Sequence, residues 1–317
     1  MSAISAAPLP DPAHTRWVDE AVARVDEALA AAIPPRGAGG LTEVMAYASL
    51  QGGKRLRPLL VLAACEALGG SRPAALRAAV AVELIHAYSL VHDDLPCMDD
   101  DVLRRGQPTT HVVHGEAMAM LAGDAMQALA FEVLTPETGI APALQARWVA
   151  CLARAAGHAG MAGGQAIDLM HVGKSLDLAG LEHMHALKTG CLLQASVAMG
   201  AMAGDADSSG QHQLASCVDQ PVWPHLMDYG RWLGLAFQVV DDILDVTQDS
   251  STLGKTAGKD EASNKPTFVS LMGLAAAQAY ALDIHARALA ALDACHLPLP
   301  GARPLRDLAH QVVSRSH

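Results

Sequence analysis

Aromatic residues, basic stretches and paired cysteines are all scarce in this chain of 317 residues. Aromatics make up 3% of the sequence and hydrophobic residues 51%, so the apolar residues are mainly alanine, leucine, valine and methionine, a composition that favours helices. The formal net charge is −11. The few basic residues cluster at particular places and form no stripe along one face, which argues against a nucleic-acid partner.

The sequence also lacks the patterns of a disulfide framework and of a membrane span. The six cysteines include no CxxC pair, and a chain of this length needs no disulfide staples, so we expect reduced thiols in a cytoplasmic protein. Pro8, Pro10 and Asp11 stand where a signal peptide would need an apolar run. The longest uncharged stretch, residues 266–282, is short for a bilayer span and is interrupted by polar residues. We therefore expect neither a secretion signal nor a membrane partner.

Helical periodicity recurs along the chain, whereas no segment alternates convincingly between apolar and polar residues as a strand would. Helices are predicted over residues 17–32, 41–51, 58–68, 73–94, 114–134, 143–156, 178–202, 225–246 and 266–292. Clusters of glycine and proline predict breaks at residues 34–37, 69–73, 204–210 and 297–304. The predicted fold class is therefore all-α, with about ten helices.

Two aspartate clusters stand in otherwise apolar surroundings. The first runs DDLPCMD from Asp93 to Asp99, and the second runs DDILD from Asp241 to Asp245. Their flanks predict buried helices, so the carboxylates at the helix ends should face a cleft. Two carboxylates about 4 Å apart repel by about 4 kcal/mol at an effective dielectric constant of roughly 20, so several carboxylates around one cavity require cations. Oxygen ligands favour Mg²⁺ or Ca²⁺ over zinc.

The two clusters differ in spacing. Asp241 and Asp245 are four residues apart, which places their carboxylates on one helix face about 6 Å apart, whereas Asp242 points about 100° away. The first cluster has two more residues between its outer aspartates, and Pro96 disfavours helical geometry at the residue before it. We therefore expect a bulge or turn to bring Asp99 back. Either cluster alone could be a solvated acidic surface; an EF-hand is excluded because its alternating ligands and closing glutamate are missing.

The two clusters lie about 150 residues apart but make chemical sense only together, so we expect one large domain although the length would allow two. We predict a disordered tail over residues 1–15 and a single helical domain over residues 16–317. Within that domain, residues 249–265 are rich in Ser, Gly, Thr and Lys, and we predict that they form a mobile lid loop.

Basic residues accompany the acidic clusters. The segment GGKRLRP at residues 52–58 combines paired glycines, which let a backbone approach an anion, with lysine and arginine, which suit phosphate oxygens. It is not a Walker A loop, because the upstream glycine and the Ser or Thr after the lysine are missing. Alone it could be a solvated turn. Arg104 and Arg105 follow the first acidic cluster, however, and acids that bind magnesium beside cations are what a polyphosphate requires.

A different metal site must also be considered. Glu83-x-x-His86 and Glu182-x-x-His185 match the two Glu-x-x-His pairs of a ferritin-like di-iron bundle. That site also needs a bridging glutamate from each of two other helices, and it leaves the aspartate clusters and basic residues unexplained. We keep the di-iron carboxylate bundle as an alternative from a different class.

Taken together, several segments resemble the bacterial trans-isoprenyl diphosphate synthases, and within that family most closely the farnesyl diphosphate synthases (geranyltranstransferases). These segments are GGKRLRP at 52–58, HDDLPCMDDDVLRRG at 92–106, GGQAIDL at 163–169, LKTG at 187–190, FQVVDDILD at 237–245 and LGKTAGKD at 253–260. The resemblance implies the all-helical isoprenoid synthase fold around a central cavity, usually in a homodimer. It also implies that the two aspartate motifs face each other across the cavity mouth.

The resemblance implies a role for each matched residue. Asp93, Asp99 and Asp241 would hold Mg²⁺, three ions in all with Mn²⁺ as a possible substitute, on an allylic diphosphate, and Asp94 and Asp245 would support them. The implied catalytic set is Asp93, Asp94, Asp99, Arg104, Lys188 and Asp241. Arg104, Lys188 and Lys255 would contact the allylic diphosphate, with Thr189 and Gln238 near the reacting carbons. Lys54, Arg57, His86 and Arg105 would form the metal-free site for isopentenyl diphosphate.

Two further features concern the loops and the product. Lys265 matches a basic position of the lid, although Pro266 beside it and the stretch 211–224 depart from the family pattern.

Tyr88 lies five residues before the first aspartate motif, where a large aromatic residue in the family stops growth at fifteen carbons. On an ideal helix, however, Tyr88 falls about 140° from Asp93, while Ser89 is nearly in line. The resemblance thus implies (2E,6E)-farnesyl diphosphate, with the C20 geranylgeranyl product as the alternative.

The implied reaction is a head-to-tail condensation. Magnesium and cationic side chains stabilise the departing diphosphate, the allylic carbocation is attacked by isopentenyl diphosphate, and the released pyrophosphate takes the proton. A catalytically idle subunit of the same fold would be expected to have lost an aspartate or the Lys54 and Arg57 pair. A terpene cyclase would normally carry Asn, Ser and Glu in its second metal motif, where this chain has aspartates.

Overall fold

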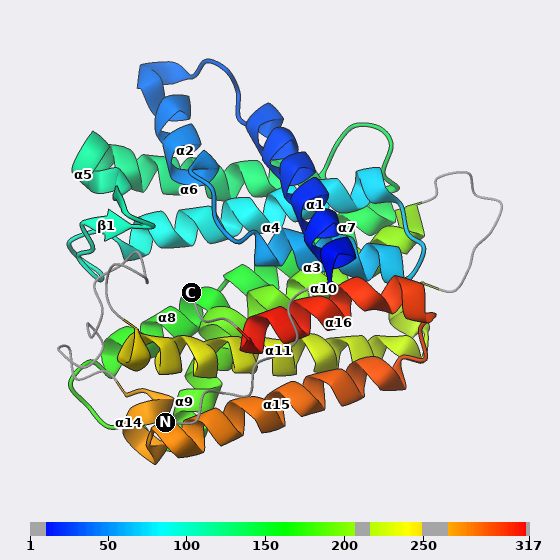
Figure 1. Cartoon of the computed structure of the whole chain (residues 1–317). Helices are drawn as coiled ribbons and strands as arrows, with labels where there is room; N and C mark the ends of the chain where they lie inside the picture. Colours follow the sequence, from blue (N-terminus) through cyan, green and yellow to red (C-terminus); the bar gives the residue numbers. More distant parts are fainter. Residues whose placement is uncertain (1–10, 207–215, 249–265, 315–317) are drawn as a thin grey trace.

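The computed structural model describes residues 11–206, 216–248 and 266–314, which form an assembly of packed helices with one short hairpin (Figure 1). The helices are α1 (Pro12–Ala32), α2 (Leu41–Leu50), α3 (Leu56–Ala67), α4 (Arg72–Asp93), α5 (Thr110–His114), α6 (Glu116–Leu134), α7 (Pro142–Ala156), α8 (Met161–Met170), α9 (Leu178–His185), α10 (Cys191–Met202), α11 (Val222–Thr247), α14 (Phe268–Met272), α15 (Leu274–Ala294) and α16 (Leu299–Val313). A π-helical turn, Ala186–Gly190, joins α9 to α10. The antiparallel strands β1 (Leu103–Arg104) and β2 (Gln107–Pro108) form the hairpin. The predicted all-α fold class is confirmed.

Local sequence explains where several helices begin. The side chain of Asp11 accepts a hydrogen bond from the backbone of Ala13 at 2.8 Å, and Pro12 occupies the first turn of α1, where no amide hydrogen is needed. Asp177 caps α9 in the same way. At α14, Thr267 and Ser270 form a reciprocal capping box.

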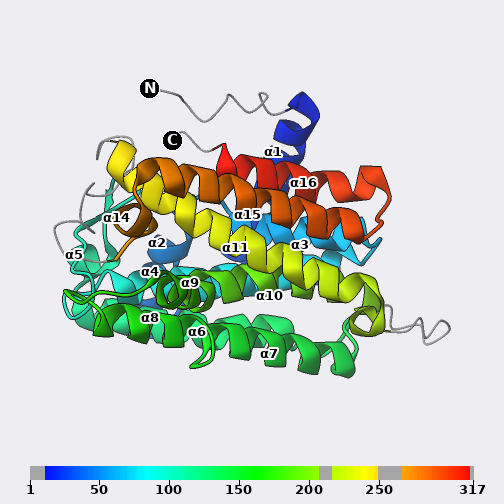
Figure 2. The same cartoon turned by 90° about the horizontal axis from the view of Figure 1, so that it is seen from below.

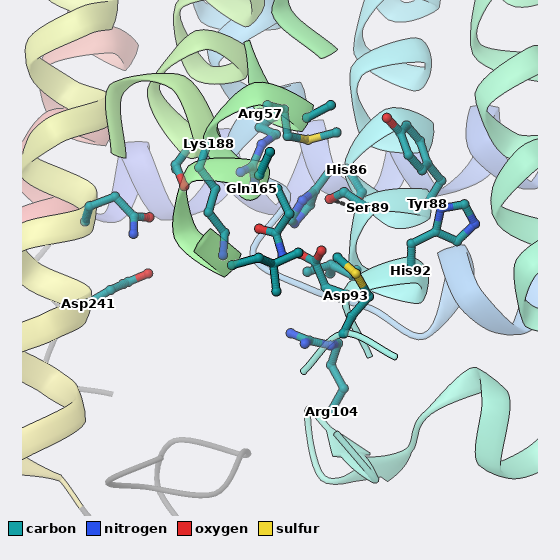
Figure 3. A pocket seen from close by; sticks show the side chains of 18 of the residues that line it. Arg57, His86, Tyr88, Ser89, His92, Asp93, Arg104, Gln165, Lys188 and Asp241 are labelled. Carbon is teal, nitrogen blue, oxygen red and sulfur yellow. Dashed lines mark hydrogen bonds between the residues drawn. The ribbon is translucent and has the colours of Figure 1, made fainter. Parts of the chain in front are cut away.

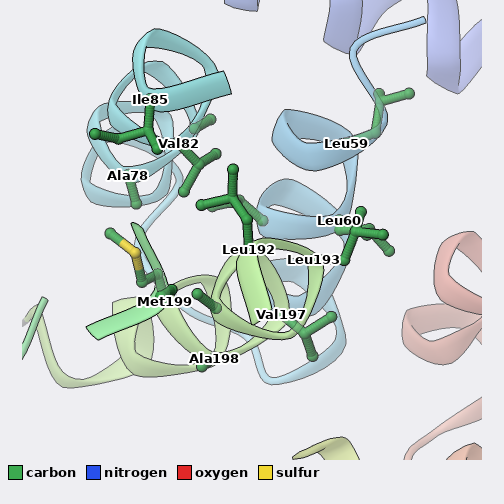
Figure 4. Close-up of a cluster of buried hydrophobic side chains, with 14 of the residues drawn as sticks. Leu59, Leu60, Ala78, Val82, Ile85, Leu192, Leu193, Val197, Ala198 and Met199 are labelled. Carbon is green, nitrogen blue, oxygen red and sulfur yellow. The ribbon is translucent and has the colours of Figure 1, made fainter. Parts of the chain in front are cut away.

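The helices pack in layers around a continuous apolar core. Figures 1 and 2 show α6 on one side of α4, with α3 and α10 beyond it, and then α11 and α16, which α15 covers. The centre lies where α3, α4 and α10 meet, and Figure 4 shows Leu60, Val82, Ile85 and Leu192 there. Small residues allow this close packing: a side chain at Gly200 would lie 2.1 Å from the backbone carbonyl oxygen of Val61.

Several predicted boundaries need correction. Residues 297–304 were predicted as a break, but α16 begins at Leu299, because Pro300 is accommodated in the first turn and Pro304 is tolerated further along. The disordered tail predicted over residues 1–15 is too long, since α1 begins at Pro12. The helix predicted over residues 266–292 breaks at Gly273, whose φ of 80° is outside the helical range. Helix α8 was not predicted.

Some predicted features lie outside the described residues. The segment 249–265, including Lys255 and Lys265, and residues 211–215 of the divergent stretch 211–224 belong to this group. Two described helices, α4 and α6, are long and apolar enough to cross a membrane by length and composition alone. Of the most apolar window in α4, 72% is buried within the fold, as expected for a core helix, against 39% in α6.

Candidate active site

A cavity of about 540 Å³ opens between α4, α8, the π-helical turn and α11 (Figure 3). Most of the predicted site residues line it, although they come from segments far apart in sequence. These residues are Arg57, His86, Tyr88, Ser89, Asp93, Arg104, Arg105, Lys188, Thr189, Gln238 and Asp241. Asp93 and Asp241 stand on opposite sides of the cavity, at the end of α4 and on α11.

The first aspartate cluster turns back on itself as expected. Helix α4 ends at Asp93, and the amide of Asp99 then donates to the carbonyl oxygen of Asp93 at 2.8 Å. A second hydrogen bond, 3.1 Å long, runs from the amide of Asp100 to the carbonyl oxygen of Leu95. The loop therefore returns Asp99 to the helix end, and the predicted turn is confirmed.

The electrostatics of Asp93 fit a site that needs a cation. Burial raises the pKa of Asp93 to about 6, and the neighbouring charge of Asp99 acts in the same direction. Lys188 and Arg104 oppose this shift. A carboxylate whose charged form is held back by burial gains from a further positive charge close by.

Asp94, predicted among the catalytic residues, does not line this cavity. It is buried, and its carboxylate accepts two hydrogen bonds from Nε of Arg104 at 2.9 Å, with a third contact to Nη2 at 2.5 Å. Such bidentate pairing fixes the guanidinium in one orientation. Asp94 therefore positions Arg104, which does line the cavity.

In the second cluster, the helical spacing separates the roles of the aspartates. Asp241 lines the cavity, whereas Asp242 and Asp245 are buried. The carboxylate of Asp242 accepts a hydrogen bond from the amide of Phe268 at 2.8 Å and so ties the start of α14 to α11. Asp242 is thus turned away from the cavity, as predicted, but Asp245, predicted to share the helix face of Asp241, does not line the cavity.

The donor set fits magnesium bound together with substrate. Among the described residues, no three His, Cys, Asp or Glu side chains gather as a ready-made metal cage. Magnesium prefers oxygen ligands and is often held by one or two carboxylates plus substrate phosphates. Asp93 and Asp241 offer such carboxylates in the cavity wall, and a diphosphate would complete the coordination. Asp99 does not line the cavity, although the turn returns its backbone to Asp93.

The same geometry argues against the di-iron alternative. Glu83 accepts a hydrogen bond from Arg55 at 2.6 Å, and Glu182 accepts one from Tyr280, so both glutamates are already engaged. His185 pairs with Gln238. These contacts account for both glutamates and for His185 without a metal.

Cations form another wall of the cavity. Burial lowers the pKa of Arg57 to about 10, which leaves it charged near neutral pH, and its Nε atom is buried without a hydrogen-bond partner in the described part of the chain. Burial, helped by Arg57 and Arg105, holds the pKa of His86 well below its usual range. His86 is therefore neutral near pH 7 and can donate one N–H to an anion. Lys54 is exposed and does not line the cavity.

The glycines of the GGKRLRP segment shape this wall. A side chain at Gly53, whose φ is 132°, would lie 2.5 Å from the guanidinium of Arg105. Arg105 also donates to the carbonyl oxygen of Gly52. The paired glycines thus let the backbone pass close to Arg105.

Sequence reasoning missed two residues that hold the site together. Nζ of Lys188 contacts Oδ2 of Asp168 at 2.6 Å, and Asp168 is buried. His185 lies 3.1 Å from the amide nitrogen of Gln238 through its Nδ1 atom and stacks on Phe268. Asp168 stands in the GGQAIDL segment, whose sequence alone assigns no role to this aspartate.

Several known proteins resemble this chain over most of its length. Residues 39–290 match the family model described as polyprenyl synthetase. A protein from Sinorhizobium fredii named probable farnesyl diphosphate synthase is 47% identical over 271 residues, which cover 84% of this chain and 79% of that protein. The heterodimeric geranylgeranyl pyrophosphate synthase large subunit 1 of Arabidopsis thaliana is 45% identical over 270 residues, which cover 83% of this chain and 70% of that protein.

A comparison with solved structures indicates the same family. A geranyltransferase from Helicobacter pylori, solved in complex with magnesium and isoprenyl diphosphate, is 33% identical with a TM-score of 0.80, and the match covers 96% of this chain and 98% of that one. Because the family model spans most of the chain and the aspartates and cations surround one cavity, the chain belongs to the polyprenyl synthetase family and is a trans-isoprenyl diphosphate synthase, an enzyme of the prenyltransferase type.

Proposed function

We propose that this enzyme condenses isopentenyl diphosphate with dimethylallyl and then geranyl diphosphate, giving (2E,6E)-farnesyl diphosphate and pyrophosphate. The observation that supports this most is the placement of Asp93 and Asp241 across one cavity whose other wall carries Arg57 and Arg105. Carboxylates with bound cations suit one diphosphate, and arginine side chains suit a second. Two diphosphate sites on one cavity are what a condensation of two diphosphates requires.

The aspartate side is the proposed allylic site. Asp93, Asp99 and Asp241 would hold magnesium, with three ions and Mn²⁺ as a substitute, and Asp245 would support them. Bound magnesium neutralises the charge that collects on the diphosphate as its bond to carbon breaks. Arg104, held by Asp94, and Lys188, held by Asp168, bring positive charge to the same diphosphate. Lys255 is proposed for this site from the sequence alone.

The arginine side is the proposed site for isopentenyl diphosphate. Arg57 and Arg105 can each offer several N–H donors to phosphate oxygens, and neutral His86 can add one. Lys54 and Lys265 are proposed as further contacts. This side needs no metal, because the isopentenyl diphosphate group does not leave during the reaction.

Bond formation then follows from the charges. The C1–O bond of the allylic substrate breaks, and its electron pair stays on the diphosphate. The double bond of isopentenyl diphosphate attacks C1, which leaves a cation on the new chain. A proton from the carbon next to that cation then passes to the released pyrophosphate. The loss of this proton re-forms a double bond in the new chain. Thr189 and Gln238, which line the cavity, are proposed to lie near the reacting carbons.

Tyr88 supports a C15 product. Its ring lines the cavity but is only 8% exposed, since it packs edge-on against His92 with ring centroids 5.6 Å apart. The side-chain amide of Gln127 donates to its hydroxyl at 3.4 Å. A ring braced from two sides can limit the growth of an apolar chain. Ser89 is small and also lines the cavity, and this favours the C20 product as the second candidate.

The central test is an assay with the purified protein. We expect condensation when Mg²⁺, isopentenyl diphosphate and either dimethylallyl or geranyl diphosphate are supplied, with farnesyl diphosphate as the main product. Chelation of the metal should stop turnover, because the charge on the departing diphosphate then stays uncompensated. Absence of condensation with both primers would refute the proposed function, and a C20 main product would refute only its chain length.

Replacement of Tyr88 by alanine tests whether this side chain limits the length of the product. We expect Tyr88→Ala to lengthen the main product by at least one five-carbon unit, because removing the ring opens the cavity along α4. Tyr88→Phe keeps the ring and should keep the wild-type product length. Chromatography of the dephosphorylated products measures both. Identical product profiles for the alanine variant and the wild type would exclude Tyr88 as the stop.

The enzyme is further proposed to act as a cytoplasmic homodimer, without nucleic acid or membrane as a partner. Helices α5 and α6 expose Val112, Val113, Met120 and Leu121, each at least 40% accessible, on neighbouring elements. An exposed apolar surface of this kind is typical of a protein interface. Sedimentation velocity of the purified protein should show a species of twice the chain mass; a monomer at micromolar concentration would contradict this.

A further inference from the structure

Gln165 on α8 is a polar side chain whose hydrogen bonds are missing. It lines the cavity between the two proposed diphosphate sites, and it belongs to the GGQAIDL segment without a role assigned from the sequence. Both its amide nitrogen and its amide oxygen are buried, and neither has a hydrogen-bond partner among the described residues. Buried polar atoms are nearly always satisfied, so two orphaned atoms on one side chain in a substrate cavity require an explanation.

The surrounding backbone holds Gln165 in place. A side chain at Gly164 would lie only 2.2 Å from the backbone nitrogen of Lys188, so α8 packs directly against the π-helical turn. The ion pair between Asp168 and Lys188 locks the same two elements one turn further along. Gln165 therefore sits on a rigid element, and its position is set by the contacts that set Lys188.

Figure 3 shows where the side chain points. Gln165 extends into the cavity between Lys188 and His86, with Asp93 close by. Lys188 and Asp93 belong to the proposed allylic side, and His86 belongs to the isopentenyl side. The amide thus lies at the junction of the two sites, where the new bond must form.

The chemistry of the substrates decides what could satisfy this amide. Ionised diphosphates offer only acceptor oxygens, which can take the amide N–H. Neither substrate carries a strong donor for the amide oxygen, but the allylic carbon becomes positively charged as its C–O bond breaks. A fixed carbonyl dipole directed at a developing positive charge lowers the energy of that charge without reorganisation.

We infer that Gln165 is a further catalytic residue of the condensation. Its N–H donates to a diphosphate oxygen, and its amide oxygen faces the carbon that becomes cationic. The leaving diphosphate keeps the electron pair of the broken bond, and the proton lost after coupling goes to pyrophosphate, so Gln165 exchanges neither electrons nor protons. This inference rests on the proposed placement of the two diphosphates.

The test compares Gln165→Leu with a matched control, Gln194→Leu. Gln194 is also half-buried, but it lies outside the cavity and its amide donates to the carbonyl oxygen of Met227 at 2.9 Å. For each purified variant, kcat, the KM of both substrates and the thermal midpoint are measured with Mg²⁺, isopentenyl diphosphate and geranyl diphosphate. Gln165→Glu is added, because it keeps the size of the side chain while replacing the N–H donors with a negative charge.

The expected result separates catalysis from stability. Gln165→Leu should lower kcat by about 100-fold, with an unchanged or higher thermal midpoint because two unsatisfied polar atoms are removed. Gln165→Glu should be at least as slow. Gln194→Leu should keep its kcat and lose stability, because its hydrogen bond is lost.

Two outcomes would overturn the inference. One is a Gln165→Leu enzyme with kcat within about threefold of the wild type, a change too small for a lost transition-state contact. The other is a fall in thermal midpoint equal to or greater than that of Gln194→Leu, which would assign Gln165 to the packing of α8. A wild-type protein that condenses neither primer would refute the proposed function itself, and this result is distinct from both.

Discussion

Replacement of Asp93 by asparagine is expected to lower kcat by about 1000-fold or more, because the substitution removes a charge on which the metal-bound diphosphate depends. Asp93 is half-buried at the end of α4, where burial raises its pKa to about 6. Asparagine has nearly the same shape but cannot neutralise a cation. Steady-state kinetics at saturating Mg²⁺ would measure the loss, and calorimetric titration of Mg²⁺ with an unreactive thio analogue of the allylic diphosphate would show weaker metal binding.

Asp228→Asn provides a matched control for this experiment. Asp228 stands on α11, the helix that carries Asp241, but it is exposed and pairs with Arg231 one turn away. Its replacement should leave kcat unchanged, since an exposed pair contributes little. If Asp93→Asn kept more than a tenth of the wild-type kcat, the assignment of Asp93 to the metal would be wrong.

The arrangement of the two aspartate clusters could be predicted from the sequence, because it depends on residues that are close together in the chain. Pro96 disfavours a helix at Leu95, so the turn that returns Asp99 to Asp93 follows from the residues themselves. The spacing of the second cluster likewise separates Asp241 from Asp242 on a helix surface. Strong helical periodicity in long segments such as α4 and α11 predicted their positions within a few residues.

Features that depend on tertiary contacts could not be predicted. Asp94 follows Asp93 directly, yet it is buried under Arg104 because the hairpin β1–β2 brings that arginine back to the helix end. The break in the helix between α9 and α10 is a π-helical turn that presents Lys188 and Thr189 to the cavity. No local pattern distinguishes such a turn from regular helix. Helix α16 was not predicted, because the prolines of residues 297–304 indicate a break, whereas the structure accommodates Pro304 inside the helix.

The basic triplet of residues 54, 55 and 57 shows most clearly that tertiary contacts cannot be predicted from local sequence. Lys54, Arg55 and Arg57 have similar chemistry and adjacent positions, but each has a different environment. Lys54 is exposed, Arg57 lines the cavity, and Arg55 is 3% exposed with its guanidinium directed into the fold. The cause is the backbone, since Arg55 has a φ of 46° at the point where the chain enters α3.

Replacement of Arg55 is therefore expected to have the largest effect on the free energy of unfolding. Its guanidinium contacts Asp26 at 2.8 Å, Glu83 at 2.6 Å and the carbonyl oxygen of Ser49 at 2.9 Å. Replacing Arg55 by methionine leaves the carboxylate of Glu83, which is 2% exposed, buried without its partner. Breaking a buried pair in this way costs about 3–5 kcal/mol of unfolding free energy. Denaturant unfolding of the purified variant would measure it.

A double variant separates the charge from the packing. If the loss comes from the unpaired carboxylate, Arg55→Met combined with Glu83→Leu should recover more than half of the lost stability, because two apolar side chains of similar size need no partner. Arg231→Met, which breaks an exposed pair on α11, should change stability by less than about 1 kcal/mol. A double variant as unstable as Arg55→Met alone would show instead that the contacts to Asp26 and Ser49, which fix the entry into α3, carry the stability. Arg55 would then stabilise the backbone at the start of α3 and not the buried charge of Glu83, and the position of Arg57 in the cavity would depend on Arg55.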